Sequence, residues 1–106
     1  MNSRIGIGLL GLGTVGSGVA NIILNPENRH PLVSEIELKR VAVRNIDRPR
    51  SIAISPNIFT TEPEEVVDDP STQVIVEVMG GIEPARSLIL RALKAGKSVV
   101  TANKAV

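Results

Sequence analysis

The feature that most constrains this chain is a run of glycines placed directly after a short apolar segment near its start. Positions 5–10 are apolar apart from two glycines, and the pattern GxGxxG follows at Gly11, Gly13 and Gly16. The residues beyond it again carry apolar side chains at helical spacing. This order predicts a buried strand that breaks into a tight turn and opens a helix.

Each glycine has a separate role in such a turn. Gly11 lets the strand turn sharply, Gly13 removes a side chain that would keep the backbone away from phosphates, and Gly16 lets the helix lie close to the sheet. A helix N-terminus with free N–H groups binds a pyrophosphate. The alternative is a structural turn with no ligand. The residues predicted to hold the pyrophosphate are Gly11, Leu12, Gly13, Thr14, Val15 and Gly16.

Composition fits one small α/β unit. The chain has 106 residues, of which 42% are hydrophobic, and Phe59 is its only aromatic residue. A core built from Val, Ile, Leu and Ala suits parallel strands covered by helices. The length suits one domain, but it is small for a dinucleotide-dependent enzyme that carries its own substrate domain.

Charge and residue usage exclude several functions. The net charge is +1 without a basic stripe, which disfavours nucleic acid as a partner. The chain has no cysteine, and its one histidine, His30, falls in a polar loop, so we expect no metal site. No apolar run approaches the roughly 20 residues of a membrane span, and no signal-peptide pattern precedes the first strand. We therefore expect a cytoplasmic protein with no membrane partner.

Strand and helix patterns alternate along the chain. Strands are expected at about 4–10, 36–44, 58–60, 73–78 and 98–101, with helices at about 14–24, from 61 to 68, and from 85 to 95. Residues 26–34 are expected to form a surface loop, and Gly96 is expected to cap the last helix. The pattern predicts an α/β fold, a Rossmann-like parallel sheet of about five strands with helices on both faces, truncated after the fifth. The expected buried helix positions are Val15, Val19, Ile22, Ile23, Leu88, Ile89, Ala92 and Leu93.

The short middle helix has its own start signal and an acidic composition. Thr61 is expected to be its N-cap, with Glu64 completing a capping box and Pro63 in the first turn. We interpret its carboxylates as a solvated helix face, and the alternative is a cation site. The acidic residues are Glu62, Glu64, Glu65, Asp68 and Asp69.

The end of the second strand bears on the choice of cofactor. A carboxylate at this tip would accept hydrogen bonds from the adenosine ribose, whereas arginine accommodates a 2′-phosphate. Arg44 occupies the position, and Arg48 and Arg50 follow it. Guanidinium groups bind phosphate in bidentate fashion, so the sequence favours NADP over NAD. The alternative is a solvated basic loop, with Asp47 reaching the ribose.

Two further segments are expected at the carboxyl edge of the sheet, where ligands of open α/β sheets bind. Gly80 and Gly81 follow the fourth strand and would let the nicotinamide half of a dinucleotide pass close to the backbone. Asn103 and Lys104 follow the fifth strand. Glu77 is one residue from this edge and either points into the site or pairs at the surface.

Four segments together resemble the cofactor-binding domain of homoserine dehydrogenase. They are LLGLGTVGSGV, VAVRN, VEVMGG and VVTANKA, and the resemblance covers essentially all of the chain. The glycine loop is shared with many oxidoreductases, but EVMGG followed about twenty residues later by TANKA is much more specific.

The resemblance implies NAD(P)-dependent interconversion of aspartate semialdehyde and homoserine, in the biosynthesis of threonine, methionine and isoleucine. It places Gly11 to Gly16 at the pyrophosphate, Arg44 at the 2′-phosphate and Lys104 beside the nicotinamide and substrate. An ammonium there would polarise the aldehyde oxygen and stabilise the developing alkoxide. The alternative for Lys104 is a surface lysine.

The resemblance also implies what residues 1–106 lack. Family members continue into a substrate domain that supplies further acid/base groups and most of the dimer contact. We expect residues 1–106, as an NAD(P)-binding domain fragment, to bind cofactor without turning over alone. Two other hypotheses stay open, a related amino-acid dehydrogenase or reductase and a non-catalytic nucleotide-sensing module.

Overall fold

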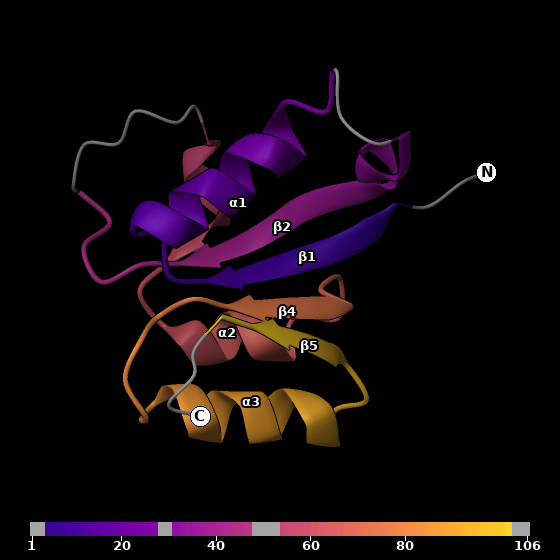
Figure 1. The fold of residues 1–106 in the computed structure, drawn as a ribbon. Helices are drawn as coiled ribbons and strands as arrows, with labels where there is room; N and C mark the ends of the chain where they lie inside the picture. Colours follow the sequence, from indigo (N-terminus) through magenta and orange to yellow (C-terminus); the bar gives the residue numbers. More distant parts are fainter. Residues whose placement is uncertain (1–3, 28–30, 48–53, 103–106) are drawn as a thin grey trace.

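The computed structural model describes residues 4–27, 31–47 and 54–102, and there five strands form one parallel sheet (Figure 1). The strand order is β3-β2-β1-β4-β5. The strands are β1 (Ile5–Leu10), β2 (Ile36–Ala42), β3 (Phe59–Thr60), β4 (Val74–Glu77) and β5 (Ser98–Thr101). The helices are α1 (Thr14–Leu24), α2 (Pro63–Asp68) and α3 (Ala85–Lys94), with 3₁₀-helices at Pro31–Glu35 and Pro56–Ile58. The predicted Rossmann-like α/β fold is confirmed.

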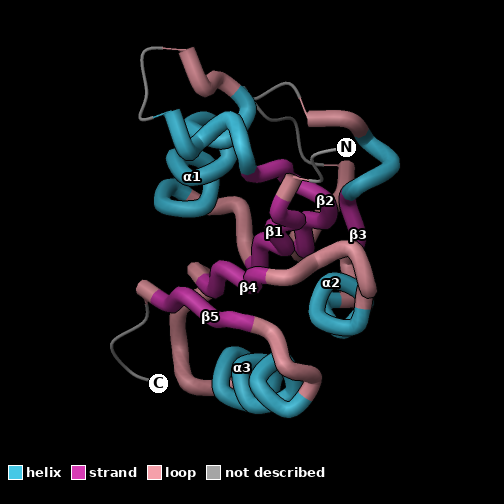
Figure 2. Tube along the Cα trace, turned by 90° about the vertical axis from the view of Figure 1, so that its right-hand side faces the viewer, coloured by secondary structure: helices cyan, strands magenta, loops and turns pink. Residues whose placement is uncertain are grey.

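Helices cover both faces of the sheet, as the sequence predicts. α1 lies on one face, over β1 and β2, and both α2 and α3 lie on the other (Figures 1 and 2). Crossover connections between parallel strands are right-handed. The connection from β1 to β2 runs along the sheet in one direction, and those from β3 to β4 and from β4 to β5 run in the other, so their helices lie on opposite faces. Among the described residues, no helix has the length and apolar content needed to cross a bilayer.

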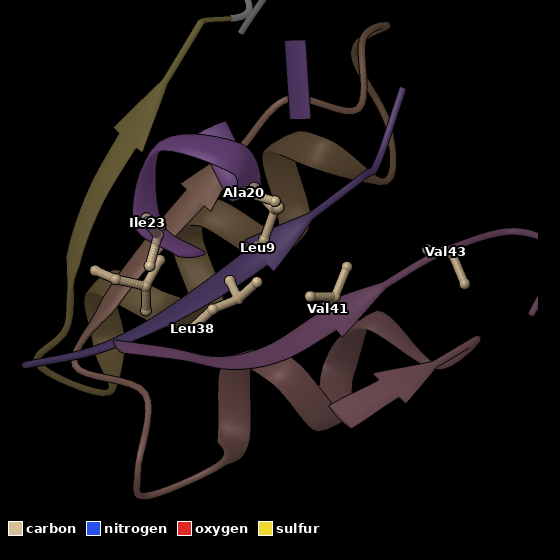
Figure 3. Close-up of a cluster of buried hydrophobic side chains, with 7 residues drawn as sticks. Leu9, Ala20, Ile23, Leu38, Val41 and Val43 are labelled. Carbon is tan, nitrogen blue, oxygen red and sulfur yellow. The ribbon is translucent and has the colours of Figure 1, made fainter. Parts of the chain in front are cut away.

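The core has two aliphatic layers that meet at β1. The layer under α1, shown in Figure 3, is formed by Ile7, Leu9, Ala20, Ile23, Leu38, Val41 and Val43. The layer under α2 and α3 is formed by Leu10, Ala42, Val66, Val67, Ile75, Leu88 and Ala92. Side chains of a strand point alternately to the two faces, so β1 contributes to both layers.

Close approach of α2 to the sheet depends on Gly8. A Cβ atom at this position would lie 2.6 Å from Cγ1 of Val66 in α2. The absence of a side chain therefore lets the helix rest on β1. Glycine in a strand often marks such a contact.

The predicted buried face of α1 is partly wrong. Ala20 and Ile23 are buried, but Val15 and Ile22 are 56% and 41% exposed. The reason lies at the start of the helix, where Gly16 sits against the glycine turn and directs the i, i+4, i+7 row inward. Val19 does pack against the core, as expected.

The predicted buried face of α3 is also partly wrong. Leu88 and Ala92 are buried and Ile89 is partly buried, but Leu93 is 53% exposed. Ala85 takes the remaining inward position. The helix ends at Lys94, and Gly96 follows in the left-handed conformation that its predicted capping role requires, with φ of +80°. The N–H of Lys97 donates to the carbonyl of Ala92.

Several element boundaries differ from the prediction. β2 ends at Ala42 rather than residue 44, and residues 31–35 form a 3₁₀-helix within the expected loop. Thr61 is not the N-cap of α2, because the helix begins at Pro63 and its N-cap is Glu62, whose own side chain makes no capping hydrogen bond. Thr60 takes the capping role from one residue earlier, since its Oγ1 accepts the N–H of Glu62 at 3.0 Å and donates to Glu65.

The acidic residues of α2 are used in local pairing. Asp68 accepts a 2.8 Å hydrogen bond from Nε of Arg91, which ties α2 to α3. Asp69 accepts hydrogen bonds from the N–H and hydroxyl of Ser71, at 2.8 Å and 2.6 Å. In the described ranges, no group of three metal-ligating side chains comes together.

Asp69 is expected to make folding stability depend on pH. The hydrogen bonds from Ser71, and then the charges of Arg40 and Lys97, hold the pKa of Asp69 below its ordinary value of 3.8. The unfolded chain binds this proton first, so the contribution is present above pH 3.8 and is lost as the pH falls through the folded pKa. Urea unfolding at pH 7 and pH 3 measures how much of the free energy of unfolding is lost between the two. This loss should be smaller for Asp69→Asn than for the unsubstituted chain, because the amide oxygen still accepts from Ser71 but does not titrate. An equal loss in both proteins would contradict this.

Candidate functional site

A pocket of about 440 Å³ opens at the carboxyl edge of the sheet, where β1 and β4 diverge into opposite crossovers. In open α/β sheets this position binds ligands. The pocket is lined by the glycine turn, the end of β2, the start of α2 and the segment after β4. The lining residues are Gly11, Leu12, Gly13, Ala42, Val43, Arg44, Asn45, Thr61, Pro63, Val78, Met79 and Pro84.

The glycine turn forms as the sequence predicts, and two of its glycines are required by the backbone. Gly11 has φ of +103°, a left-handed conformation that favours glycine, and its N–H donates to the carbonyl of Ala42 at 3.0 Å. A Cβ atom at Gly16 would lie 2.4 Å from the carbonyl oxygen of Gly11. Gly16 therefore lets α1 begin directly on the turn.

Gly13 is not required by the fold in the same way. It is the N-cap of α1 with φ of −81°, which any residue adopts, and a Cβ atom there would meet nothing within 4 Å. No side chain caps the helix, and the first turn carries no acidic residue. The N-terminus of α1 therefore keeps uncapped backbone N–H groups and its positive dipole end beside the pocket wall at Gly13, while Thr14, Val15 and Gly16 are not themselves lining residues. This arrangement suits a phosphate group.

Arg44 lies at the end of β2 on the wall of the pocket, and it is the only charged residue among the described lining residues. Its position is set by the preceding residue, because the N–H of Val43 donates to the carbonyl of Thr60 at 2.9 Å. Asp47 is not among the lining residues. Its N–H instead donates to Oδ1 of Asn45 at 3.0 Å, which closes a local turn.

The segment after β4 reaches the pocket through Val78 and Met79. The N–H of Val78 donates to the carbonyl of Leu10 at 3.0 Å, so the end of β4 lies beside the glycine turn. Gly80 and Gly81 follow with φ of +83° and +77°. Gly80 is next to a lining residue without lining the pocket itself, and its contact with a cofactor stays a prediction.

Glu77 takes neither of the two predicted positions and instead lies in the interior. Its side chain is fully buried, and it neither lines the pocket nor forms a surface pair. One carboxylate oxygen accepts the N–H of Met79 and the other accepts the hydroxyl of Thr101.

Several predicted positions lie outside the described residues. These are Lys104 with Asn103, the additional arginines Arg48 and Arg50, and His30. Their predicted roles stay predictions.

Sequence reasoning did not assign eight of the lining residues to the site, namely Ala42, Val43, Asn45, Thr61, Pro63, Val78, Met79 and Pro84. Thr61 and Pro63 come from the start of α2, and Pro84 immediately precedes α3. A signal was available in the topology, because the residues that follow each parallel strand gather at the same edge. Thr61 was instead assigned to helix capping.

The chain is similar to one known family in sequence and to solved structures of its members. The family model described as "Homoserine dehydrogenase, NAD binding domain" matches residues 11–106. The chain is 55% identical to homoserine dehydrogenase from Synechocystis sp. over 100 residues, which are 94% of this chain and 23% of the relative. It is 41% identical to the Bacillus subtilis enzyme over 102 residues, again 94% of this chain and 24% of the relative. The chain thus spans about a quarter of the length of these relatives.

Solved structures give the same result. A crystal structure of S. aureus homoserine dehydrogenase at pH 8.5 matches with a TM-score of 0.86 and 42% identity, covering 100% of this chain and 27% of that chain. The homoserine dehydrogenase from Thiobacillus denitrificans matches with a TM-score of 0.76 and 44% identity. The glycine turn, the pocket beside it and the family match agree, and the chain belongs to the homoserine dehydrogenase NAD-binding domain family.

Proposed function

We propose that this chain binds an NAD(P) dinucleotide in the pocket at the carboxyl edge, with the pyrophosphate on the N-terminus of α1. The observation that carries the proposal is Gly13, which stands at an uncapped helix N-terminus with open space beside it. A cap without a side chain leaves both the N–H groups and the space free for phosphate oxygens. The glycine turn and the uncapped helix N-terminus therefore suit the NAD that the family description names.

We propose further that the preferred cofactor is NADP. Arg44 supports this preference, because it lines the pocket where the adenosine ribose of a dinucleotide would lie in this fold. Its guanidinium can pair with a 2′-phosphate in bidentate fashion. Thr61, which also lines the pocket, carries an uncharged hydroxyl that can hydrogen-bond the ribose or base.

We propose that this domain serves the NAD(P)-dependent interconversion of aspartate semialdehyde and homoserine. The bound nicotinamide supplies or accepts the hydride. The glycine turn and the end of β2 hold the dinucleotide in one orientation, which fixes where its reactive ring lies. Lys104 would place an ammonium near the aldehyde oxygen and stabilise negative charge as it develops there.

A chimera tests this activity. The Synechocystis homoserine dehydrogenase with its matching segment replaced by this chain should reduce aspartate semialdehyde, measured by loss of nicotinamide absorbance. Substituting Lys104→Ala should lower kcat at least about 100-fold, as loss of a proton-donating or charge-stabilising group does. Lys94→Ala removes an exposed lysine at the C-terminal end of α3 and should change kcat less than about twofold.

The chimera also separates the proposals. An inactive but folded chimera that still binds NADPH would contradict the proposed activity and leave cofactor binding standing. An active chimera in which Lys104→Ala is silent would contradict only the role of the lysine.

A further inference from the structure

Glu77 is a buried carboxylate in a strand that is otherwise apolar. It ends β4 after Val74, Ile75 and Val76, and its side chain is 0% exposed. Burying a carboxylate is costly unless hydrogen bonds compensate, and an aliphatic residue would fill the same space at no such cost. The hydrogen bonds that the carboxylate accepts therefore hold neighbouring segments of the chain in one arrangement.

That arrangement consists of the two segments that leave the sheet at the carboxyl edge. One oxygen of Glu77, Oε2, accepts the N–H of Met79 at 2.8 Å, and Oε1 accepts the hydroxyl of Thr101 at 2.5 Å. The backbone carbonyl of Glu77 also accepts the N–H of Ala102 at 3.3 Å. One residue thus holds the chain after β4 and the chain after β5 in a fixed relation.

The segment after β4 lines the pocket, and the segment after β5 leads to the predicted position of Lys104. Met79 lines the pocket, and the left-handed Gly80 and Gly81 come directly after it. Thr101 ends β5, three residues before Lys104. The glycine turn and Arg44, which would hold the adenosine diphosphate half, have no hydrogen bond to Glu77 among those described. The carboxylate of Glu77 thus bonds to Met79 and Thr101, and Met79 in turn lies beside Gly11, because a Cβ at Gly11 would lie 3.4 Å from the Cα of Met79.

We propose that Glu77 is a positioning residue for the nicotinamide half of the dinucleotide. It acts through Met79 and Thr101 and does not itself touch the cofactor. The inference rests on the proposed dinucleotide binding. A purely structural role, as a lock on the sheet edge, would instead affect both halves of the ligand equally.

Two probes distinguish the halves. NADPH carries the whole dinucleotide, and ADP-ribose 2′-phosphate has the same phosphates without nicotinamide; NADH and ADP-ribose form the matching pair. Calorimetric titration of the chain with both pairs should show that Glu77→Met weakens dinucleotide binding at least about tenfold, because the N–H of Met79 loses its partner. Binding of the nicotinamide-free probes should weaken less than about threefold, because the helix N-terminus that holds their phosphates is unchanged.

Glu77→Gln serves as the conservative variant. Its amide oxygen can accept from Met79, and its amide N–H can donate to the Thr101 hydroxyl, which rotates to accept. Dinucleotide affinity should therefore stay within about threefold of the unsubstituted chain.

Thr72→Val serves as the matched control. Thr72 is 1% exposed near the opposite end of β4, and its hydroxyl donates to the carbonyl of Val66 at 2.7 Å. Its loss should lower the free energy of unfolding without selectivity between the probes.

The outcomes are separable. Equal weakening of both probes by Glu77→Met, or no weakening in a folded variant, would overturn the positioning role. If the unsubstituted chain binds no probe, the proposed function itself fails. Should Glu77→Met not fold, Thr101→Val removes one anchor at constant shape; a selective loss of dinucleotide binding supports the proposal and an unselective loss overturns it.

Discussion

Gly13→Asp should abolish dinucleotide binding while slightly stabilising the fold. Asp is among the best N-cap residues, and a carboxylate at this end of α1 interacts favourably with the helix dipole, so the free energy of unfolding should rise by roughly 0.3 kcal/mol. The same carboxylate would occupy the open space beside the turn and repel the pyrophosphate. Affinity should fall at least about 100-fold, from charge repulsion and lost N–H contacts together. Calorimetric titration and urea unfolding measure the two effects.

The opposite signs are what make this substitution informative. If the turn were only structural, a better cap would stabilise the helix and dinucleotide affinity would not fall. Gly13→Asn adds nearly the same volume without charge and should retain more affinity than the aspartate variant. Gly18→Ala is a control in the same helix, because a Cβ there also meets nothing within 4 Å. Unchanged NADPH affinity in a folded Gly13→Asp variant would contradict the pyrophosphate assignment.

Arg44→Gln should lower NADPH affinity about 10- to 100-fold, the range expected for loss of a charge-assisted bidentate contact with the 2′-phosphate. NADH lacks that phosphate, so its affinity should change less than about threefold. Titration of each variant with both cofactors measures the ratio. The side chain is exposed, and raised salt should therefore weaken the NADPH preference of the unsubstituted chain.

Lys94→Gln provides the charge control for this experiment. It removes one positive charge from the C-terminal end of α3, away from the lining residues of the pocket. Its NADPH affinity should match that of the unsubstituted chain. Equal weakening of NADPH and NADH by Arg44→Gln would show that the arginine contributes general attraction rather than recognition of the 2′-phosphate.

The parts of the site that sequence predicts are those encoded by local backbone requirements. Gly11 needs a left-handed φ and Gly16 needs contact without a Cβ, so their spacing alone indicates the turn. Gly96 is predicted at the end of α3 for the same reason. The aliphatic composition likewise indicates parallel strands with two covered faces.

The parts that sequence does not predict depend on contacts between distant segments. Which face of α1 is buried is decided by how Gly16 rests on the turn, and periodicity alone favoured Val15 and Ile22 incorrectly. Thr60 rather than Thr61 bonds the start of α2 because β3 ends there. The burial of Glu77 requires a hydroxyl from β5, 24 residues further along the chain.

β1 has a consequence for how the domain unfolds. Its side chains enter both aliphatic layers, with Leu9 in one and Leu10 in the other, and both are fully buried. If β1 leaves the sheet, both layers lose buried side chains at the same time, so the two layers should unfold together. The domain should therefore melt as one cooperative unit, and a cofactor that stabilises the turn at the end of β1 would protect both layers together.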